Sequence, residues 1–164
     1  MLRAVFLMLA AALLVAGCGF HLRGAAELPF KSIYIDAPPA SVFATQLRRV
    51  INASSDTRIV ENPKEAEVVL QLLDERREKE ILSLSGAGRV SEYLLRYRVT
   101  FRVLDKKQRE VVPTSQISLR REVTYNVEQA LAESAEEELL YRDMQNDAVQ
   151  QILRRLQATH LAQH

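Results

Sequence analysis

The chain has 164 residues, of which 48% are hydrophobic and 26% charged, with 22 Lys and Arg residues against 21 Asp and Glu residues. This composition is that of an ordinary globular domain and excludes a chain that is disordered throughout. The formal net charge of +1 gives no support to nucleic-acid binding, which calls for a clearly basic protein or face.

The first residues are typical of a secretory signal peptide. Arg3 and the amino terminus supply a positive start, residues 4–16 are apolar, and Gly17 is the small residue that a signal peptidase requires. The alternative is a transmembrane helix, but this apolar run is shorter than the about 20 residues that spanning requires. We therefore expect residues 1–17 to be a signal peptide and residues 18–164 to be a single periplasmic domain.

The only cysteine of the chain, Cys18, completes the sequence Val-Ala-Gly-Cys, which matches the bacterial lipobox. In such a site the sulfur receives a diacylglycerol and the freed amine is acylated, and several acyl chains together hold a protein firmly on a membrane. The alternative is a free thiol after a conventional signal, which is a liability in an oxidising compartment. Gly19 stands where an Asp would resemble an inner-membrane retention signal. The prediction is therefore lipidation of Cys18 and a lipid anchor on the periplasmic side of the outer membrane.

The next segments predict a strand, a helix and a strand. Residues 31–37 read as a strand that ends at Pro38-Pro39. Ser41 is a suitable cap for a helix that runs to about Ser54, since apolar residues recur there at helical spacing. Residues 57–61 predict a short second strand, for which a parallel crossover connection is the default.

The middle of the chain changes to a period of two. In residues 93–103 the odd-numbered positions are Tyr, Leu, Tyr, Val, Phe and Val, which predicts a strand with one buried face. The other face carries a basic ladder that includes Arg96, Arg98 and Arg102. A polar loop at 105–110 leads to a last strand near 116–125, so three long antiparallel strands are expected.

From about Glu133 the pattern is helical, with an apolar stripe that ends at Leu156. Acidic residues at 136–138 and basic residues at 154–155 suit the two ends of a helix dipole. Two helices cannot cover both faces of the sheet. The expected fold class is α/β (α+β), with two helices packed on one face of a mixed four- to five-stranded sheet and the other face left to solvent or a partner.

Residues suited to catalysis are scarce. None of the three histidines, His21, His160 and His164, has a second ligand at metal spacing. The glycines at 86 and 88 lack the lysine and helix of a phosphate-binding loop and predict a hairpin turn, and no nucleophile motif is present. We expect no cofactor, no metal site and no enzymatic activity. The alternatives are a lipid-anchored envelope hydrolase that uses His21 and a free periplasmic glycolipid carrier.

Three stretches together resemble the LptE family of lipopolysaccharide-assembly lipoproteins: CGFHLRG at 18–24, LSLSGAGRVSEYLLRYRVTFRV at 82–103 and MQNDAVQQILRRL at 144–156. The resemblance implies a small α/β domain that plugs the large outer-membrane β-barrel LptD and takes part in lipopolysaccharide transport to the cell surface. The polar interior of such a barrel suits a domain of near-zero net charge.

The same resemblance suggests which residues bind. Guanidinium groups bind phosphates through charge-assisted hydrogen bonds, so basic residues on the predicted strand at 93–103 and in the turns on either side of it are candidates for contact with lipopolysaccharide phosphates. These candidates are Arg89, Arg96, Arg98, Arg102, Lys106 and Lys107. The alternative for each is a charge that faces solvent or the barrel. Phe20, His21 and Arg23 are candidates for contact with the partner, the alternative being that they only orient the leader.

Overall fold

The computed structural model describes residues 27–125 and 130–159, with side chains described for all of these except residues 130–133. The predicted signal peptide, Cys18, and the predicted partner contacts Phe20, His21 and Arg23 therefore lie outside the described residues. So do His160 and His164.

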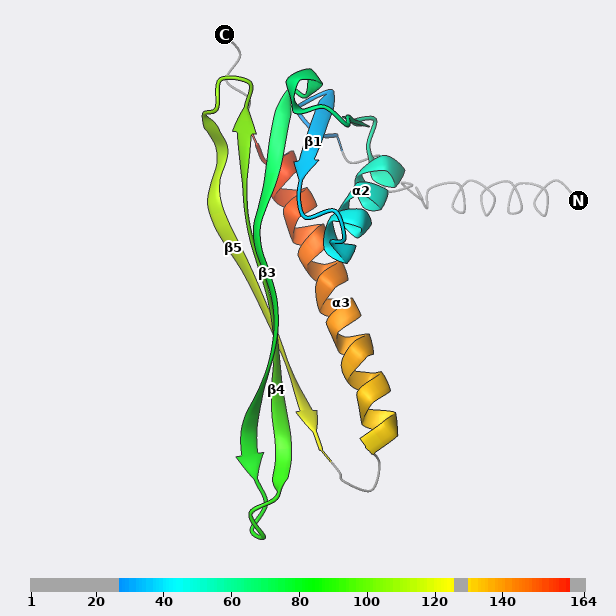
Figure 1. Ribbon diagram of the computed structural model, residues 1–164, viewed down its shortest axis with the longest axis vertical. Coiled ribbons are helices and arrows are strands. Elements are labelled where there is room, and N and C mark those ends of the chain that lie inside the picture. The colour runs from blue at the N-terminus through cyan, green and yellow to red at the C-terminus, as the bar shows by residue number, and fades with distance from the viewer. Residues whose placement is uncertain (1–26, 126–129, 160–164) are drawn as a thin grey trace, which may run out of the picture.

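A mixed five-stranded sheet with the order β2-β1-β3-β4-β5 forms the centre of the described fold (Figure 1). The short strand β1 (Ser32–Asp36) pairs in parallel with β2 (Arg58–Ile59) on one side and with β3 (Val68–Leu84) on the other. The long strands β3, β4 (Val90–Asp105) and β5 (Glu110–Thr124) form an antiparallel meander. A single 3-10 turn, η1 (Pro63–Glu65), connects β2 to β3.

Helix α2 (Val42–Ser54) follows β1 and begins where the sequence predicts. The Ser41 hydroxyl accepts a hydrogen bond of 3.0 Å from the backbone N–H of Ala44, which is the usual geometry of an N-cap. Phe43, Leu47 and Ile51 form its buried stripe. The predicted strand, helix, strand unit with parallel pairing is therefore confirmed, although β2 is shorter than the expected 57–61.

The alternation along β4 separates the two faces of the sheet. Leu95, Tyr97, Val99, Phe101 and Val103 are all buried, as predicted, whereas Tyr93, expected on the same face, is only half-buried. The even-numbered residues from Leu94 to Arg102, on the other face, are only half-buried. One face of the sheet therefore belongs to the core, and we call the opposite face the open face.

Helix α3 (Ala130–Gln157) packs along the core face and begins three residues before the expected start near Glu133. Met144, Ala148, Ile152 and Leu156 are fully buried and join one apolar cluster with the sheet and with α2. Both helices lie on the same side of the sheet in Figure 1. The predicted α+β architecture, with two helices on one face of a mixed sheet, is confirmed, and the sheet has five strands.

Candidate functional site

The predicted basic ladder lies on the open face, but its arginines are paired with acidic residues of the neighbouring strand. Arg96 lies 3.2 Å from a carboxylate oxygen of Glu80 and 3.9 Å from one of Glu78. Arg98 forms an ion pair with Glu78. These carboxylates belong to β3, whose Glu78 lies directly opposite Arg96 in the antiparallel register.

Arg102 completes the ladder and is also engaged. Its Nε donates a hydrogen bond of 2.7 Å to Gln71 Oε1, and its guanidinium lies 3.9 Å from the Glu110 carboxylate. The three arginines thus lie on the predicted face of the strand. That face carries acidic as well as basic side chains. A phosphate that bound them would have to compete with carboxylates already in place.

Arg89 lies in a different setting, at the β3–β4 hairpin. The Ser85 N–H donates to the Arg89 carbonyl at 2.7 Å, and Gly88 takes a φ of 72°, a left-handed conformation that glycine adopts without strain. The predicted hairpin turn is therefore present. Within the described chain the Arg89 side chain has no hydrogen bond or ion pair, so its guanidinium is available to a ligand.

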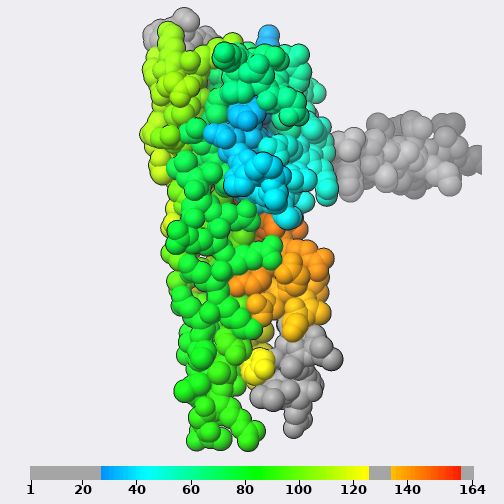
Figure 2. Space-filling model, in the orientation of Figure 1, coloured from blue at the N-terminus to red at the C-terminus, as the bar shows by residue number. Residues whose placement is uncertain are grey.

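Exposed apolar side chains accompany Arg89 at this hairpin. Ile81, Leu82 and Leu84 are 59%, 45% and 58% exposed, an unusual cluster for a water-facing turn. The hairpin forms the lower extremity of the molecule in Figure 1 and narrows to a tip in Figure 2. We call residues 81–90 the hairpin tip. The sequence reasoning missed these apolar residues, although the run ILSL before SGAG was the available signal.

Lys106 and Lys107 lie at the opposite end of β4, in the turn to β5. This turn is organised by Asp105, whose carboxylate accepts backbone hydrogen bonds from Lys107 at 2.8 Å and Arg109 at 2.9 Å. These bonds, with the Arg109 side chain, hold the pKa of Asp105 below its ordinary value. The carboxylate therefore stays charged and fixes the turn.

The six predicted basic residues do not form one site. Strand β4 has 16 residues and separates Arg89 from the two lysines by roughly 50 Å at about 3.3 Å per residue. The ion-paired arginines lie between them. The structure thus divides the predicted row into the hairpin tip, a neutralised middle and a distant lysine turn.

A second set of charges, missed by the sequence reasoning, joins the sheet to α3. Lys79 Nζ lies 2.6 Å from Glu137, Arg77 lies 3.1 Å from Glu138, and Arg121 lies 3.0 Å from Asp147. The Lys79 ammonium also stands 4.1 Å from the centre of the Tyr93 ring. We call these three ion pairs the charged layer.

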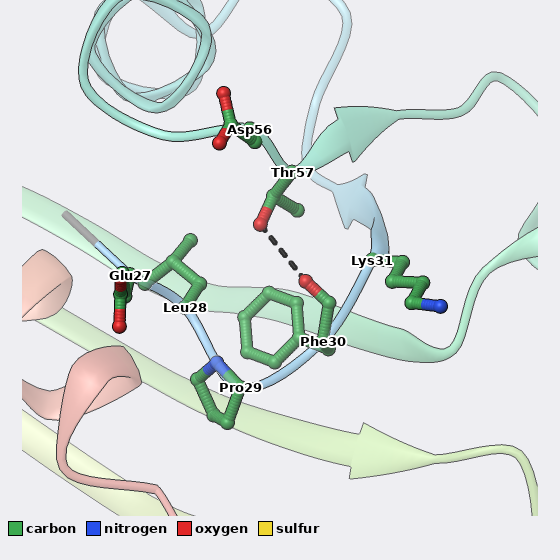
Figure 3. A pocket seen from close by; sticks show the side chains of 7 residues that line it. All are labelled: Glu27, Leu28, Pro29, Phe30, Lys31, Asp56 and Thr57. Atoms are coloured by element: carbon green, nitrogen blue, oxygen red, sulfur yellow. Dashed lines mark hydrogen bonds between the residues drawn. The ribbon is translucent and has the colours of Figure 1, made fainter. Parts of the chain in front are cut away.

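A cavity of about 380 Å³ lies beside the start of β1 and is lined by residues 27–31 with Asp56 and Thr57 (Figure 3). The Thr57 hydroxyl donates a hydrogen bond of 2.9 Å to the Phe30 carbonyl, so it is already engaged. Within residues 27–125 and 134–159, no group of acidic, His or Cys side chains could hold a metal ion. None of the described helices has the length and apolarity needed to cross a membrane.

The fold defines a small α+β domain with a mixed five-stranded sheet. Comparison with known proteins then gives the family: the LptE profile, described as lipopolysaccharide-assembly, matches residues 30–156. The chain belongs to the LptE family. Membership gives it a non-enzymatic role in lipopolysaccharide assembly as an envelope lipoprotein, and the resemblance found in the sequence is confirmed.

Individual relatives support this assignment. The chain is 30% identical to the LPS-assembly lipoprotein LptE of Photorhabdus laumondii, over 93% of this chain and 84% of the relative. It is also 30% identical to the protein of that name from Yersinia enterocolitica, over 98% of this chain and 79% of the relative.

Solved structures share the fold. Lipoprotein B of Nitrosomonas europaea has a TM-score of 0.75 and 45% identity, with coverage of 85% of this chain and 91% of that one. Rare lipoprotein B of Shewanella oneidensis has a TM-score of 0.68 and 26% identity, with coverage of 77% and 94%.

Proposed function

We propose that this chain is an outer-membrane lipoprotein, acylated at Cys18, that plugs and helps assemble the LptD β-barrel and takes part in lipopolysaccharide transport to the cell surface. The family match supports a role in lipopolysaccharide assembly. The open face of the sheet supports a position inside the barrel. A face of balanced, ion-paired charges suits a water-accessible barrel interior better than a lipid-facing position does.

The hairpin tip is the part of the structure that supports direct binding of lipopolysaccharide. A phosphorylated glycolipid presents anionic phosphates beside acyl chains. The tip offers an unengaged guanidinium at Arg89 beside the exposed side chains of Ile81 and Leu84, so it matches both parts of the ligand. The ladder arginines, whose carboxylate partners are already in place, are secondary candidates.

The barrel partnership is tested by purification of the full-length lipoprotein from detergent-solubilised outer membranes. We expect the chain to be recovered with a barrel protein identifiable by mass spectrometry as LptD. Recovery of the chain alone, under conditions that keep other membrane complexes intact, would contradict the proposal.

Lipopolysaccharide binding is tested with the purified lipoprotein carrying Arg89→Glu, and with Arg49→Glu on the exposed side of α2 as the matched control. A charge-assisted hydrogen bond contributes roughly 1.5–3 kcal/mol, so we expect Arg89→Glu to weaken binding by about tenfold or more. The control should bind like the unaltered protein. Equal losses in both variants would show nonspecific charge attraction and remove the site from the hairpin tip.

Arg96→Glu combined with Arg98→Glu serves as a third variant. If the ladder rather than the tip holds the phosphates, this variant loses more affinity than Arg89→Glu. The comparison therefore separates the two candidate locations, the turn before β4 and the open face of β4.

A further inference from the structure

The two edges of the sheet differ in a way that the sequence did not reveal. At one edge, β2 has only two residues, so it presents little unpaired backbone. At the other edge, β5 has 15 residues and pairs only with β4, and no described element continues the sheet beyond it. Natural proteins normally shorten or cover a long edge strand, because its free backbone groups pair readily with another chain.

The register identifies which backbone groups of β5 face outward. The Tyr125 N–H donates to the Ser91 carbonyl at 2.8 Å, which makes this a hydrogen-bonded pair. Such pairs alternate along an antiparallel ladder, so residues 117, 119, 121 and 123 also bond to β4. The backbone groups of the residues between them point away from the sheet. These residues are Gln116, Ser118, Arg120, Glu122 and Thr124, and the side chains of all five are exposed.

This free stretch is long and has no register irregularity in its pairing with β4. The register irregularity of the β4–β5 pair lies near Val112, and Pro113 lies before the free stretch. From Gln116 to Thr124 the edge extends for about 27 Å at about 3.4 Å per residue. One outward group is engaged, since the Arg120 carbonyl accepts a hydrogen bond of 2.9 Å from the Arg121 guanidinium.

Side-chain charges at this edge lack partners as well. Arg120 lies directly opposite Arg96 in the register, a like-charged pair on the same face. In the described chain neither the Arg120 guanidinium nor the Glu122 carboxylate has an ion pair, whereas Arg96 and Arg98 are both ion-paired. An added strand with an acidic residue opposite Arg120 and a basic residue opposite Glu122 would supply both missing partners.

From these observations we infer that the free edge of β5 binds an extended segment of the barrel partner, which adds to the sheet as a sixth strand. The inference rests on the proposed function. The strands of a closed barrel wall are already paired on both sides, so the docking segment must come from a loop or terminal segment that reaches into the lumen. Its residues on the core side would face Leu119 and Val123 and are expected to be apolar.

Substitution of Ser118 by proline tests whether the outward backbone N–H of β5 takes part in binding. Ser118→Pro removes an outward N–H and leaves the hydrogen bonds to β4 in place, whereas Ser118→Ala keeps that N–H. Both are introduced into the full-length lipoprotein and purified from outer membranes. If β5 binds the partner strand, Ser118→Pro recovers several-fold less barrel protein than Ser118→Ala, while the two variants melt at similar temperatures.

A photo-crosslinking amino acid, p-benzoylphenylalanine, tests the same edge through an exposed side chain and does not depend on a proline being tolerated. It replaces Arg120 in one variant and Arg58, on the exposed β2 edge, in the control. We expect the crosslinker at position 120 to react with the barrel protein much more strongly than the crosslinker at position 58 does.

The outcomes separate this inference from the proposed function. If the unaltered lipoprotein is recovered without a barrel, the proposed function fails and this inference fails with it. If the barrel is recovered but Arg120 crosslinks no more than Arg58, the edge inference alone is overturned. A crosslink from Arg120 to a second copy of this chain would likewise overturn it and identify the edge as a dimer contact.

Discussion

The two ends of the long sheet are held by different forces. Around β1 and α2 the helices and strands share one apolar cluster in which Phe43, Phe101 and Ile152 are fully buried. Toward the hairpin tip α3 meets the sheet through the charged layer, in which side chains are partly exposed. Burial is largely insensitive to salt and to partners, whereas half-exposed ion pairs are weak and screened.

This difference assigns separate tasks to the two ends. The apolar end sets the stability of the domain, and the charged layer adds weak polar contacts that hold the long hairpin against α3. A region held by weak polar contacts opens at lower free-energy cost, and such regions are commonly the ones that bind. The hairpin tip, with its exposed apolar residues, lies at this end.

The largest expected effect comes from a cavity in the apolar end. Phe101→Ala removes a fully buried ring from β4. Loss of a buried aromatic ring costs about 3–5 kcal/mol, so the free energy of unfolding should fall by that amount. Urea denaturation of the purified protein measures it. A loss below about 1 kcal/mol would show that the apolar cluster does not dominate stability.

An intermediate effect is expected at the junction of the two ends, where Glu75 connects three elements. The buried Tyr97 hydroxyl donates a hydrogen bond of 2.8 Å to the Glu75 carboxylate, and the Ser41 hydroxyl at the start of α2 donates another of 3.3 Å. Tyr97→Phe removes one of these bonds. Because hydrogen bonds to charged groups contribute roughly 1.5–3 kcal/mol, the free energy of unfolding should decrease by about that amount near neutral pH.

The same tyrosine makes stability depend on pH. Burial, reinforced by the Glu75 hydrogen bond, raises the pKa of Tyr97 above its ordinary value of 10.0. A raised pKa in the folded state means that the contribution is complete below pH 10 and is lost as the pH rises above it. Denaturation at a series of alkaline pH values should show a steeper loss of stability above pH 10 for the unaltered protein than for Tyr97→Phe. Parallel profiles would contradict this assignment.

The smallest effect is expected in the charged layer. Lys79→Met keeps the aliphatic part of the side chain over Tyr93 but removes the ion pair with Glu137. Pairs with this degree of exposure contribute roughly 0.2–1 kcal/mol, and the contribution falls with added salt. Hydrogen exchange in the first turns of α3 should accelerate at low salt, with little difference from the unaltered protein at high salt.

Arg76→Met is the matched control for this change, since Arg76 pairs only with Asp74 in the described chain and is strongly exposed. It should leave exchange in α3 unaltered. If both variants change exchange equally, the layer is not what attaches α3 to the hairpin.

The elements that the sequence predicted well are those set by local rules. The β4 alternation and the α2 stripe are fixed by periods of two and 3.6 residues, and Ser41 caps α2 through a contact three residues away. Strand lengths were predicted less well. β5 begins at Glu110 rather than near 116, because pairing with β4 extends it through a sequence in which Pro113 reads as a strand breaker.

The candidate site shows the same limit. Arg96 and Arg98 were placed on the correct face, but their carboxylate partners come from β3, and Glu78 and Glu80 meet them only through the register across the hairpin. The period of a strand says which face a residue occupies and nothing about what lies opposite. Arg89 and the two lysines, though on one predicted row, are separated by the full length of β4.

By itself, the sequence determined the family, the two helices, the buried face of β4 and the expectation of a lipid anchor at Cys18, because each rests on a local pattern or a short motif. Only the tertiary structure decided that the ladder is ion-paired, that Arg89 is unengaged among exposed apolar residues, and that β5 ends the sheet with its outer edge free. These features depend on strand order and register, which are set by contacts between residues far apart in the chain.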